Sequence, residues 1–231
     1  MTLLFDPPPP VLAPTSDGRD YPVRRLFCIG RNYAEHAREM GVEVDRDAPF
    51  YFTKWAETVV PSGPIAYPAM TQNYHYEAEL VVAIGKGGRK IPVDRALEHV
   101  YGFATGLDMT RRDLQLEARA KGRPWDAGKN VEQSSPLGLI HPFSDTGPLS
   151  RGAIRLTVNG EIRQQADLAD LIHPVPDLIA FLSRAYRLEP GDLIYTGTPA
   201  GVGAVMPGDE VVVSIDGLTD TVVTVTPQVD D

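Results

Sequence analysis

Two glutamates separated by one residue, Glu77 and Glu79, are the side chains of this chain whose types and spacing could most clearly do chemistry. They precede a continuous apolar segment at residues 80–84, which predicts a strand with at least one buried face. Side chains two positions apart on a strand point to the same face. Two neighbouring carboxylates repel each other unless a cation or protons neutralise them, so this spacing predicts a metal or proton site.

A third carboxylate, Asp108, is expected to complete this site. It ends another apolar segment, residues 101–107, and precedes a helix-like stretch at residues 110–115. Three carboxylates with open coordination positions are typical of Mg²⁺ or Mn²⁺, which prefer oxygen ligands, and fit Zn²⁺ less well. The alternative is that Glu77 and Glu79 lie on the solvated face of an edge strand and that Asp108 only caps the following helix.

A histidine and a glutamate, His36 and Glu39, are spaced to lie on one face of a short helix predicted at residues 33–40. Asn32 is the expected N-cap and Gly41 the expected end. A histidine oriented by a carboxylate can take a proton from water near neutral pH. The charged segment that follows, residues 43–47, is expected to belong to a lid. The alternative is an ordinary surface pair on a helix.

The formal charge of −9, from 22 basic and 31 acidic residues, argues against binding to nucleic acid or to an anionic membrane. An anionic substrate would therefore need cations placed locally. Arg112 and Gln115, at i and i+3 of one predicted helix, and Lys129 are the candidates. The glycine-rich segment 197–203 lacks the long helix of a nucleotide site, and it is interpreted as a loop that holds Thr198 toward a bound anion.

At 231 residues the chain can form one large domain or two small ones, and we expect a single catalytic domain, residues 23–231, preceded by a Pro-rich segment at residues 1–22. Many short β-rich runs alternate with few helical ones, chiefly residues 167–171 and 175–187, so the expected fold class is α+β and β-dominated. The single cysteine, Cys28, is expected to be an inert core thiol. No signal peptide or apolar span is recognised, and cytoplasmic residence is the default expectation.

Several of these segments together resemble the fumarylacetoacetate hydrolase family, over essentially everything from residue 23 to the C-terminal strands. The matching motifs are GRNY at 30–33 with His36 and Glu39, FTK at 52–54, HYEAEL at 75–80, LDMTRRDLQ at 107–115, GRPW at 122–125 with Lys129, and GD at 191–192 with TGTPAGVG at 196–203. Within the family, the chain is most similar to the acylpyruvate hydrolases, including those that cleave fumarylpyruvate.

The resemblance implies a mixed β-sandwich roll with its site at one mouth, and a homodimer. It also implies that His36 and Glu39 are the catalytic dyad on a lid, that Thr198 contacts the substrate and that Lys129 approaches its oxo or enolate oxygen. Lys54 is implied as a further cation near the pocket. Two departures from the family pattern, Trp55 after Lys54 and the tripeptide NVE at 130–132, leave the acyl preference open.

These residues together suggest a metal-dependent hydrolase that binds a small 2-oxo acid and cleaves a carbon–carbon bond in an acylpyruvate, with fumarylpyruvate giving fumarate and pyruvate. The metal would help to stabilise the pyruvate enolate. The same enolate would form in an oxaloacetate decarboxylase, and an isomerase of unsaturated 2-oxo diacids needs a similar site. A module that binds a metal or a dicarboxylate without catalysis would need the three carboxylates but not His36 and Glu39.

Overall fold

Apolar side chains on both faces of one central strand, β8 (Ala78–Ile84), set the architecture of the chain. The computed structural model describes residues 3–41 and 48–228, and every residue of β8 in it is buried. Leu80 and Val82 join one apolar core, whereas Val81 and Ala83 join a second. Because successive side chains of a strand point to opposite faces, both faces of β8 must be covered by other elements.

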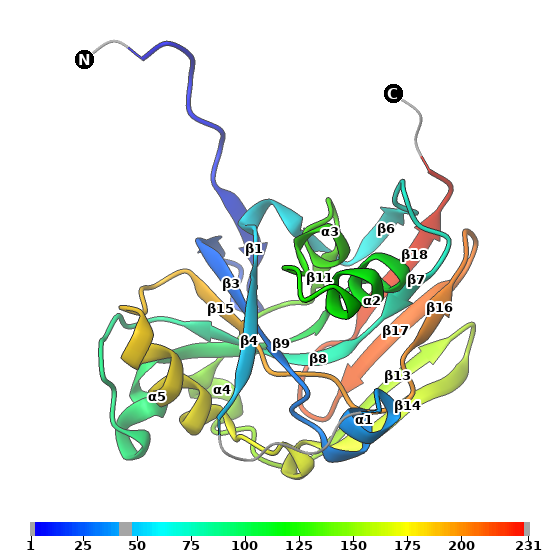
Figure 1. Cartoon of the computed structure of the whole chain (residues 1–231). Coiled ribbons are helices and arrows are strands. Elements are labelled where there is room, and N and C mark those ends of the chain that lie inside the picture. Colours follow the sequence, from blue (N-terminus) through cyan, green and yellow to red (C-terminus); the bar gives the residue numbers. More distant parts are fainter. Residues whose placement is uncertain (1–2, 42–47, 229–231) are drawn as a thin grey trace.

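The strand β8 lies inside an eight-stranded mixed sheet (Figure 1). Its order is β4-β3-β15-β8-β9-β11-β5, with β12 paired to β9. The bounds of the other members are β3 (Arg25–Gly30), β4 (Phe50–Lys54), β5 (Val59–Pro61), β9 (Val100–Leu107), β11 (Ser135–Leu137), β12 (His141–Pro142) and β15 (Asp192–Tyr195).

Three smaller sheets complete the β-structure, with strand orders β14-β13-β17-β18-β6, β10-β7-β16 and β1-β2. Their strands are β1 (Val11–Pro14), β2 (Asp20–Val23), β6 (Gly63–Ala66), β7 (Tyr74–Tyr76), β10 (Thr110–Arg111), β13 (Ala153–Val158), β14 (Glu161–Asp167), β16 (Gly203–Val205), β17 (Glu210–Ile215) and β18 (Thr221–Thr226). Leu156 and Val213 of the five-stranded sheet share a core with Leu80 and Val82, so these two sheets pack face to face.

The described helices are short and connect or cover the sheets (Figure 1). They are α1 (Ala34–Glu39), α2 (Arg112–Ala120), α3 (Asp126–Lys129), α4 (Phe143–Thr146) and α5 (Val175–Ala185), with 3-10 turns η1 (Ala56–Thr58), η2 (Val93–His99) and η3 (Leu168–Asp170). The predicted α+β, β-dominated roll is therefore confirmed. Among residues 3–41 and 48–228, no helix is long and apolar enough to cross a bilayer.

The antiparallel pairing of β8 with β9 brings distant carboxylates to one place. Glu79 lies opposite Gly106, and Ala78 lies opposite Leu107. One step beyond this register, the backbone N–H of Asp108 donates to the carbonyl oxygen of Glu77 at 2.9 Å. Two segments separated by about thirty residues of sequence thus present their acidic side chains side by side.

The helix predicted at residues 33–40 is present as α1, but Asn32 is not its N-cap. The N-cap is Tyr33, which makes no side-chain capping bond. The buried Asn32 side chain instead donates to the carbonyl oxygens of His173 and Thr196 and accepts the N–H of His173 at 2.8 Å. It therefore ties α1 to the loop after β15. Gly41 ends the helix as expected, with φ of 67°.

The N-terminal residues have two parts. The proline-rich part is exposed and extends away from the body of the protein (Figure 1). Residues 11–23 then form the β1–β2 ribbon, whose Ala13 and Tyr21 are buried in the second core. The predicted boundary at residue 22 falls inside this ribbon, and the division into a leader and one catalytic domain stays a prediction. The expected lid segment, residues 43–47, lies outside the described residues.

Replacing Asn32 by alanine is expected to lower the free energy of unfolding by roughly 2–4 kcal/mol, because buried backbone groups on two loops would lose their partners. Urea denaturation followed by circular dichroism measures this. Gln165→Ala, at an exposed amide, is the control, and it should change stability by no more than about 0.5 kcal/mol. Equal stability of the two variants would show that Asn32 does not hold these loops together.

Candidate metal centre and active site

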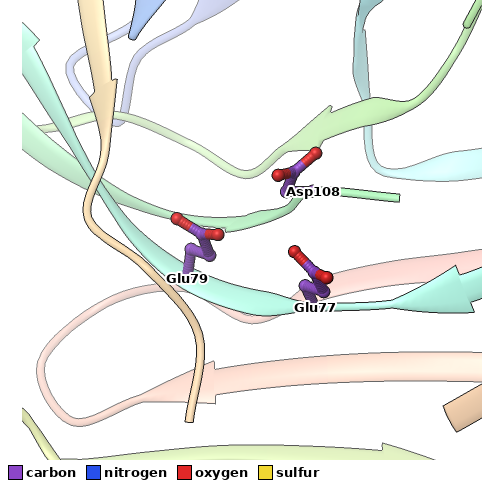
Figure 2. Close-up of side chains that lie close together, drawn as sticks. All are labelled: Glu77, Glu79 and Asp108. Atoms are coloured by element: carbon purple, nitrogen blue, oxygen red, sulfur yellow. The ribbon is translucent and has the colours of Figure 1, made fainter. Parts of the chain in front are cut away.

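The carboxylates of Glu77, Glu79 and Asp108 converge in the interior of the protein (Figure 2). One oxygen from each lies within 4.8 Å of the others, and the three residues are 5%, 2% and 1% exposed. Glu79 belongs to β8, Glu77 fills the break between β7 and β8, and Asp108 follows β9. The alternative of a solvated edge strand is therefore excluded. Oxygen donors in this arrangement fit a hard divalent cation.

Three buried cations, Lys129, Arg112 and Lys54, pair with the acidic cluster. Lys129, from α3, donates from Nζ to Glu77 at 2.8 Å, to Asp108 at 2.7 Å and to the Thr110 hydroxyl at 2.7 Å. Arg112, from α2, donates to Glu77 and to the side chain of Gln115. Burial alone would raise the pKa of Glu77, but Lys129 and Arg112 hold it well below its usual range.

Glu79 is the carboxylate of the cluster without a cationic partner among the described residues. It accepts the backbone N–H of Gly197 at 2.6 Å. Burial, together with the charges of Asp108 and Glu77, raises its pKa well above the usual value. A divalent ion would replace the proton that this environment favours. The residues present therefore fit a metal, and Glu79 is the carboxylate of the cluster whose negative charge most needs one.

Gly197 is required at its position in the loop after β15. Its φ is 99°, and a Cβ there would lie 2.7 Å from the Cβ of Asn32. The missing side chain lets the loop lie against Asn32 and against Ile29 of β3, in the position where the Gly197 N–H reaches Glu79.

The predicted pair His36 and Glu39 is formed on α1. The Nδ1 atom of His36 lies 3.1 Å from a carboxylate oxygen of Glu39, and His36 is buried. Glu39 in turn accepts the backbone N–H of Gly201 at 3.1 Å and 3.2 Å. The contact between His36 and Glu39 fixes the orientation of the imidazole ring and leaves Nε2 of His36 without a bond to any described residue.

A hollow that is partly open to solvent connects the acidic cluster with His36. Of the residues predicted to contact substrate, Arg112, Gln115, Thr198 and Lys129 line it. Its other lining residues are Ile29, Gly30, Arg31, Met40, Phe52, Arg119 and Trp125. The acidic cluster, His36 and four predicted substrate contacts therefore open on one space.

Lys54 lies near the hollow, as expected, but outside its lining. Its Nζ donates to Asp108 at 2.9 Å and to the carbonyl oxygen of Ser134 at 2.8 Å, and it does not line the hollow. Lys54 thus forms a buried ion pair with Asp108 without reaching the hollow. Lys129 reaches the hollow, but protein acceptors engage all three of its N–H groups. A contact with a substrate oxygen requires Lys129 to exchange one of them.

Sequence reasoning missed the residues that hold the active-site side chains in place. Gln164, on β14, donates to the Thr198 hydroxyl at 2.8 Å and accepts the N–H of Ala78 at 2.9 Å. It lies in a polar strand with no distinguishing pattern. The role of Gly201 could have been suspected from the glycine-rich segment, but its partner, Glu39, lies far away in sequence.

The two departures from the family pattern contact each other. The backbone N–H of Trp55 donates to the side-chain oxygen of Asn130 at 2.8 Å. Asn130 also donates to Asp126 at 3.1 Å. The residues that follow Lys54 and Lys129 are therefore joined directly, on the outer side of the cluster.

Comparison with known proteins agrees with this geometry. The family model described as fumarylacetoacetate (FAA) hydrolase C-terminal matches residues 25–226. A fumarylpyruvate hydrolase from Ralstonia sp. is 52% identical over 191 residues, covering 81% of this chain and 99% of the relative. The human mitochondrial oxaloacetate tautomerase is 41% identical over 196 residues, covering 84% and 88%.

A solved structure has the same fold throughout. The crystal structure of fumarylpyruvate hydrolase from Pseudomonas aeruginosa, in complex with Mn²⁺ and pyruvate, is 49% identical, with a TM-score of 0.96 over 98% of this chain and 100% of that one. The family match, the identities and the shared fold lead to one conclusion. The chain belongs to the fumarylacetoacetate hydrolase family.

Proposed function

We propose that this protein is a metal-dependent hydrolase that cleaves a carbon–carbon bond in acylpyruvates, with fumarylpyruvate as substrate and fumarate and pyruvate as products. The observation that carries the proposal is that the buried acidic cluster opens on the same hollow as His36, whose ring contacts Glu39. The similarity to proteins named fumarylpyruvate hydrolases, one of them bound to Mn²⁺ and pyruvate, supports this choice of substrate and metal.

The three carboxylates would hold one Mn²⁺ or Mg²⁺ ion. When bound, the ion would supply positive charge to the carboxylate and 2-oxo oxygens of the substrate and so favour the enolate form of its pyruvate half. Arg112, Gln115 and Thr198 present hydrogen-bond donors to the same anionic end. The Lys129 ammonium group is placed to stabilise negative charge on the departing pyruvate oxygen.

His36 acts on water in this proposal. Glu39 holds the Nδ1 side of the ring, so Nε2 can accept a proton from a water molecule in the hollow. The activated water attacks the carbonyl carbon distal to the carboxylate. The bond between that carbon and the methylene group then breaks, giving the acyl product as an acid and pyruvate as its enolate. A non-catalytic binding module would have no use for this dyad.

Tautomerisation or decarboxylation of oxaloacetate is the second candidate function. The human relative named oxaloacetate tautomerase supports it, because it shares 41% identity over most of both chains. Both reactions pass through an enolate of a 2-oxo acid and need no attack by water at a distal carbonyl. Isomerisation of a 2-oxo diacid belongs to the same group of alternatives.

The cellular setting is proposed on the same basis. We place the enzyme in the catabolism of aromatic compounds, in the cytoplasm, acting as a homodimer of one catalytic domain per chain. Size-exclusion chromatography with light scattering tests the dimer independently of activity.

The purified protein is expected to cleave fumarylpyruvate with Mn²⁺ or Mg²⁺ present and to lose this activity after chelation, because the enolate would lose its stabilising charge. Release of pyruvate is measured with a coupled assay. Acetylpyruvate and oxaloacetate are assayed in parallel. Turnover of oxaloacetate alone would replace the hydrolase by the second candidate.

Replacing Glu79 by glutamine is expected to weaken Mn²⁺ binding by at least about 100-fold, because it removes the ligand charge that lacks a protein counter-ion. Saturating Mn²⁺ should raise the Tm of the natural protein by roughly 5–10 °C and that of Glu79→Gln much less. Glu98→Gln, which alters an exposed ion pair with Arg95, is the control. An equal Tm increase in both variants would exclude Glu79 as a ligand.

Replacing His36 by asparagine is expected to lower kcat for fumarylpyruvate by about 10²- to 10⁴-fold while leaving the Mn²⁺-dependent Tm increase intact. The reason is that His36 accepts a proton but does not hold the metal. His99→Asn, at a histidine that does not line the hollow, is the matched control. Full hydrolase activity of His36→Asn would assign water activation to another group.

A further inference from the structure

Two arginines that line the hollow, Arg31 and Arg119, are not used by the metal cluster or by the dyad. The other two cations of the lining already have acidic partners: Arg112 pairs with Glu77, and Lys129 pairs with Glu77 and Asp108. Within residues 3–41 and 48–228, no carboxylate forms an ion pair with Arg31 or Arg119. Both side chains are only partly buried, so they can meet a ligand from solvent.

Arg119 lies on the same face of α2 as Arg112, but farther along the helix from the acidic cluster. Arg112, Gln115 and Arg119 occupy positions i, i+3 and i+7, which share one side of a helix. The rise of 1.5 Å per residue puts Arg119 about 10 Å along the axis from Arg112. Helical side chains lean toward the N-terminus, which directs Arg119 back over the hollow. Its guanidinium also donates to the carbonyl oxygen of Met40 at 3.3 Å.

Arg31 lines the same hollow from the end of β3. It follows β3 with a φ of 58°, a left-handed conformation that is uncommon for a residue other than glycine. Its guanidinium lies over the ring of Phe50, 5.5 Å from the centroid. Strain of this kind often accompanies a functional placement. Burial, and the neighbouring positive charge of Arg119, lower the pKa of Arg31.

From this geometry we infer that Arg31 and Arg119 form a subsite for a second carboxylate, at the acyl end of the substrate. The inference rests on the proposed function and specifies its substrate class as acylpyruvates whose acyl group ends in a carboxylate. We place the 2-oxo acid end at the acidic cluster. In an extended seven-carbon diacid, the two carboxylate carbons are six bonds and roughly 7 Å apart, since an extended chain advances about 3.5 Å over three bonds. Arginine guanidinium groups suit this contact, because they bind carboxylates through paired hydrogen bonds.

Binding of two matched ligands to the Mn²⁺-loaded protein tests this subsite without requiring turnover. The ligands are 2-oxoheptanedioate and 2-oxoheptanoate, which have equal length and differ in a terminal carboxylate against a methyl group. Calorimetry should show the diacid binding at least about 10-fold more tightly to the natural protein. Arg31→Gln and Arg119→Gln should each reduce this preference to about 2-fold or less, and Arg119→Lys should retain part of it.

Arg123→Gln is the control for general electrostatic attraction, because Arg123 is an exposed arginine of the adjoining hollow formed with Phe50 and Trp125. It should leave the preference unchanged. The inference is overturned if the natural protein shows no preference, if the preference survives both Gln variants, or if Arg123→Gln removes it equally. A parallel loss of affinity for both ligands would also overturn it, since that result assigns Arg119 only a structural role at Met40.

Kinetics separate this inference from the proposed function. Arg31→Gln and Arg119→Gln should lower kcat/KM for fumarylpyruvate by about 10- to 100-fold and for acetylpyruvate by less than about 3-fold. If the natural protein cleaves neither substrate, the proposed function fails, while the ligand preference still reports on the arginine pair. If it cleaves both and the variants affect both equally, only the subsite fails.

Discussion

Burial of three like charges at one point is the constraint on which the rest of the structure depends. Glu77, Glu79 and Asp108 cannot all remain ionised in the interior without nearby positive charge. Lys129, Arg112 and Lys54 reach two of the carboxylates from three different segments. The elements that carry these cations are therefore held against the β8–β9 pair by electrostatic attraction as well as by packing.

The loop after β15 connects the acidic cluster to the pair of His36 and Glu39. Its backbone donates to Glu79 through Gly197 and to Glu39 through Gly201, and Asn32 joins it to the start of α1. One segment thus sets the position of Glu79, the proposed metal ligand, relative to the pair of Glu39 and His36, the proposed proton acceptor. A displacement of this loop would change both halves of the site together, which explains why it contains residues that permit close backbone approach.

The acidic cluster could be predicted from the sequence because each carboxylate has a recognisable local pattern around it. Glu77 and Glu79 share a strand face, and Asp108 ends the next apolar run. The family resemblance supplied the role of His36. The counter-ion role of Lys54, the anchoring by Asn32 and the partners of the Gly197 and Gly201 N–H groups could not be predicted, because each depends on contacts between segments distant in sequence. The expected N-cap failed for the same reason: tertiary partners outcompeted the local capping bond.

The bond between Trp55 and Asn130 has an evolutionary consequence. A proline at position 55 has no N–H and would leave the Asn130 side-chain oxygen without this donor. Because the donor is a backbone N–H, every residue except proline at position 55 keeps this bond, whereas a residue at position 130 without a side-chain acceptor removes it. The two positions are therefore linked in one case only, the exchange of Trp55 for proline.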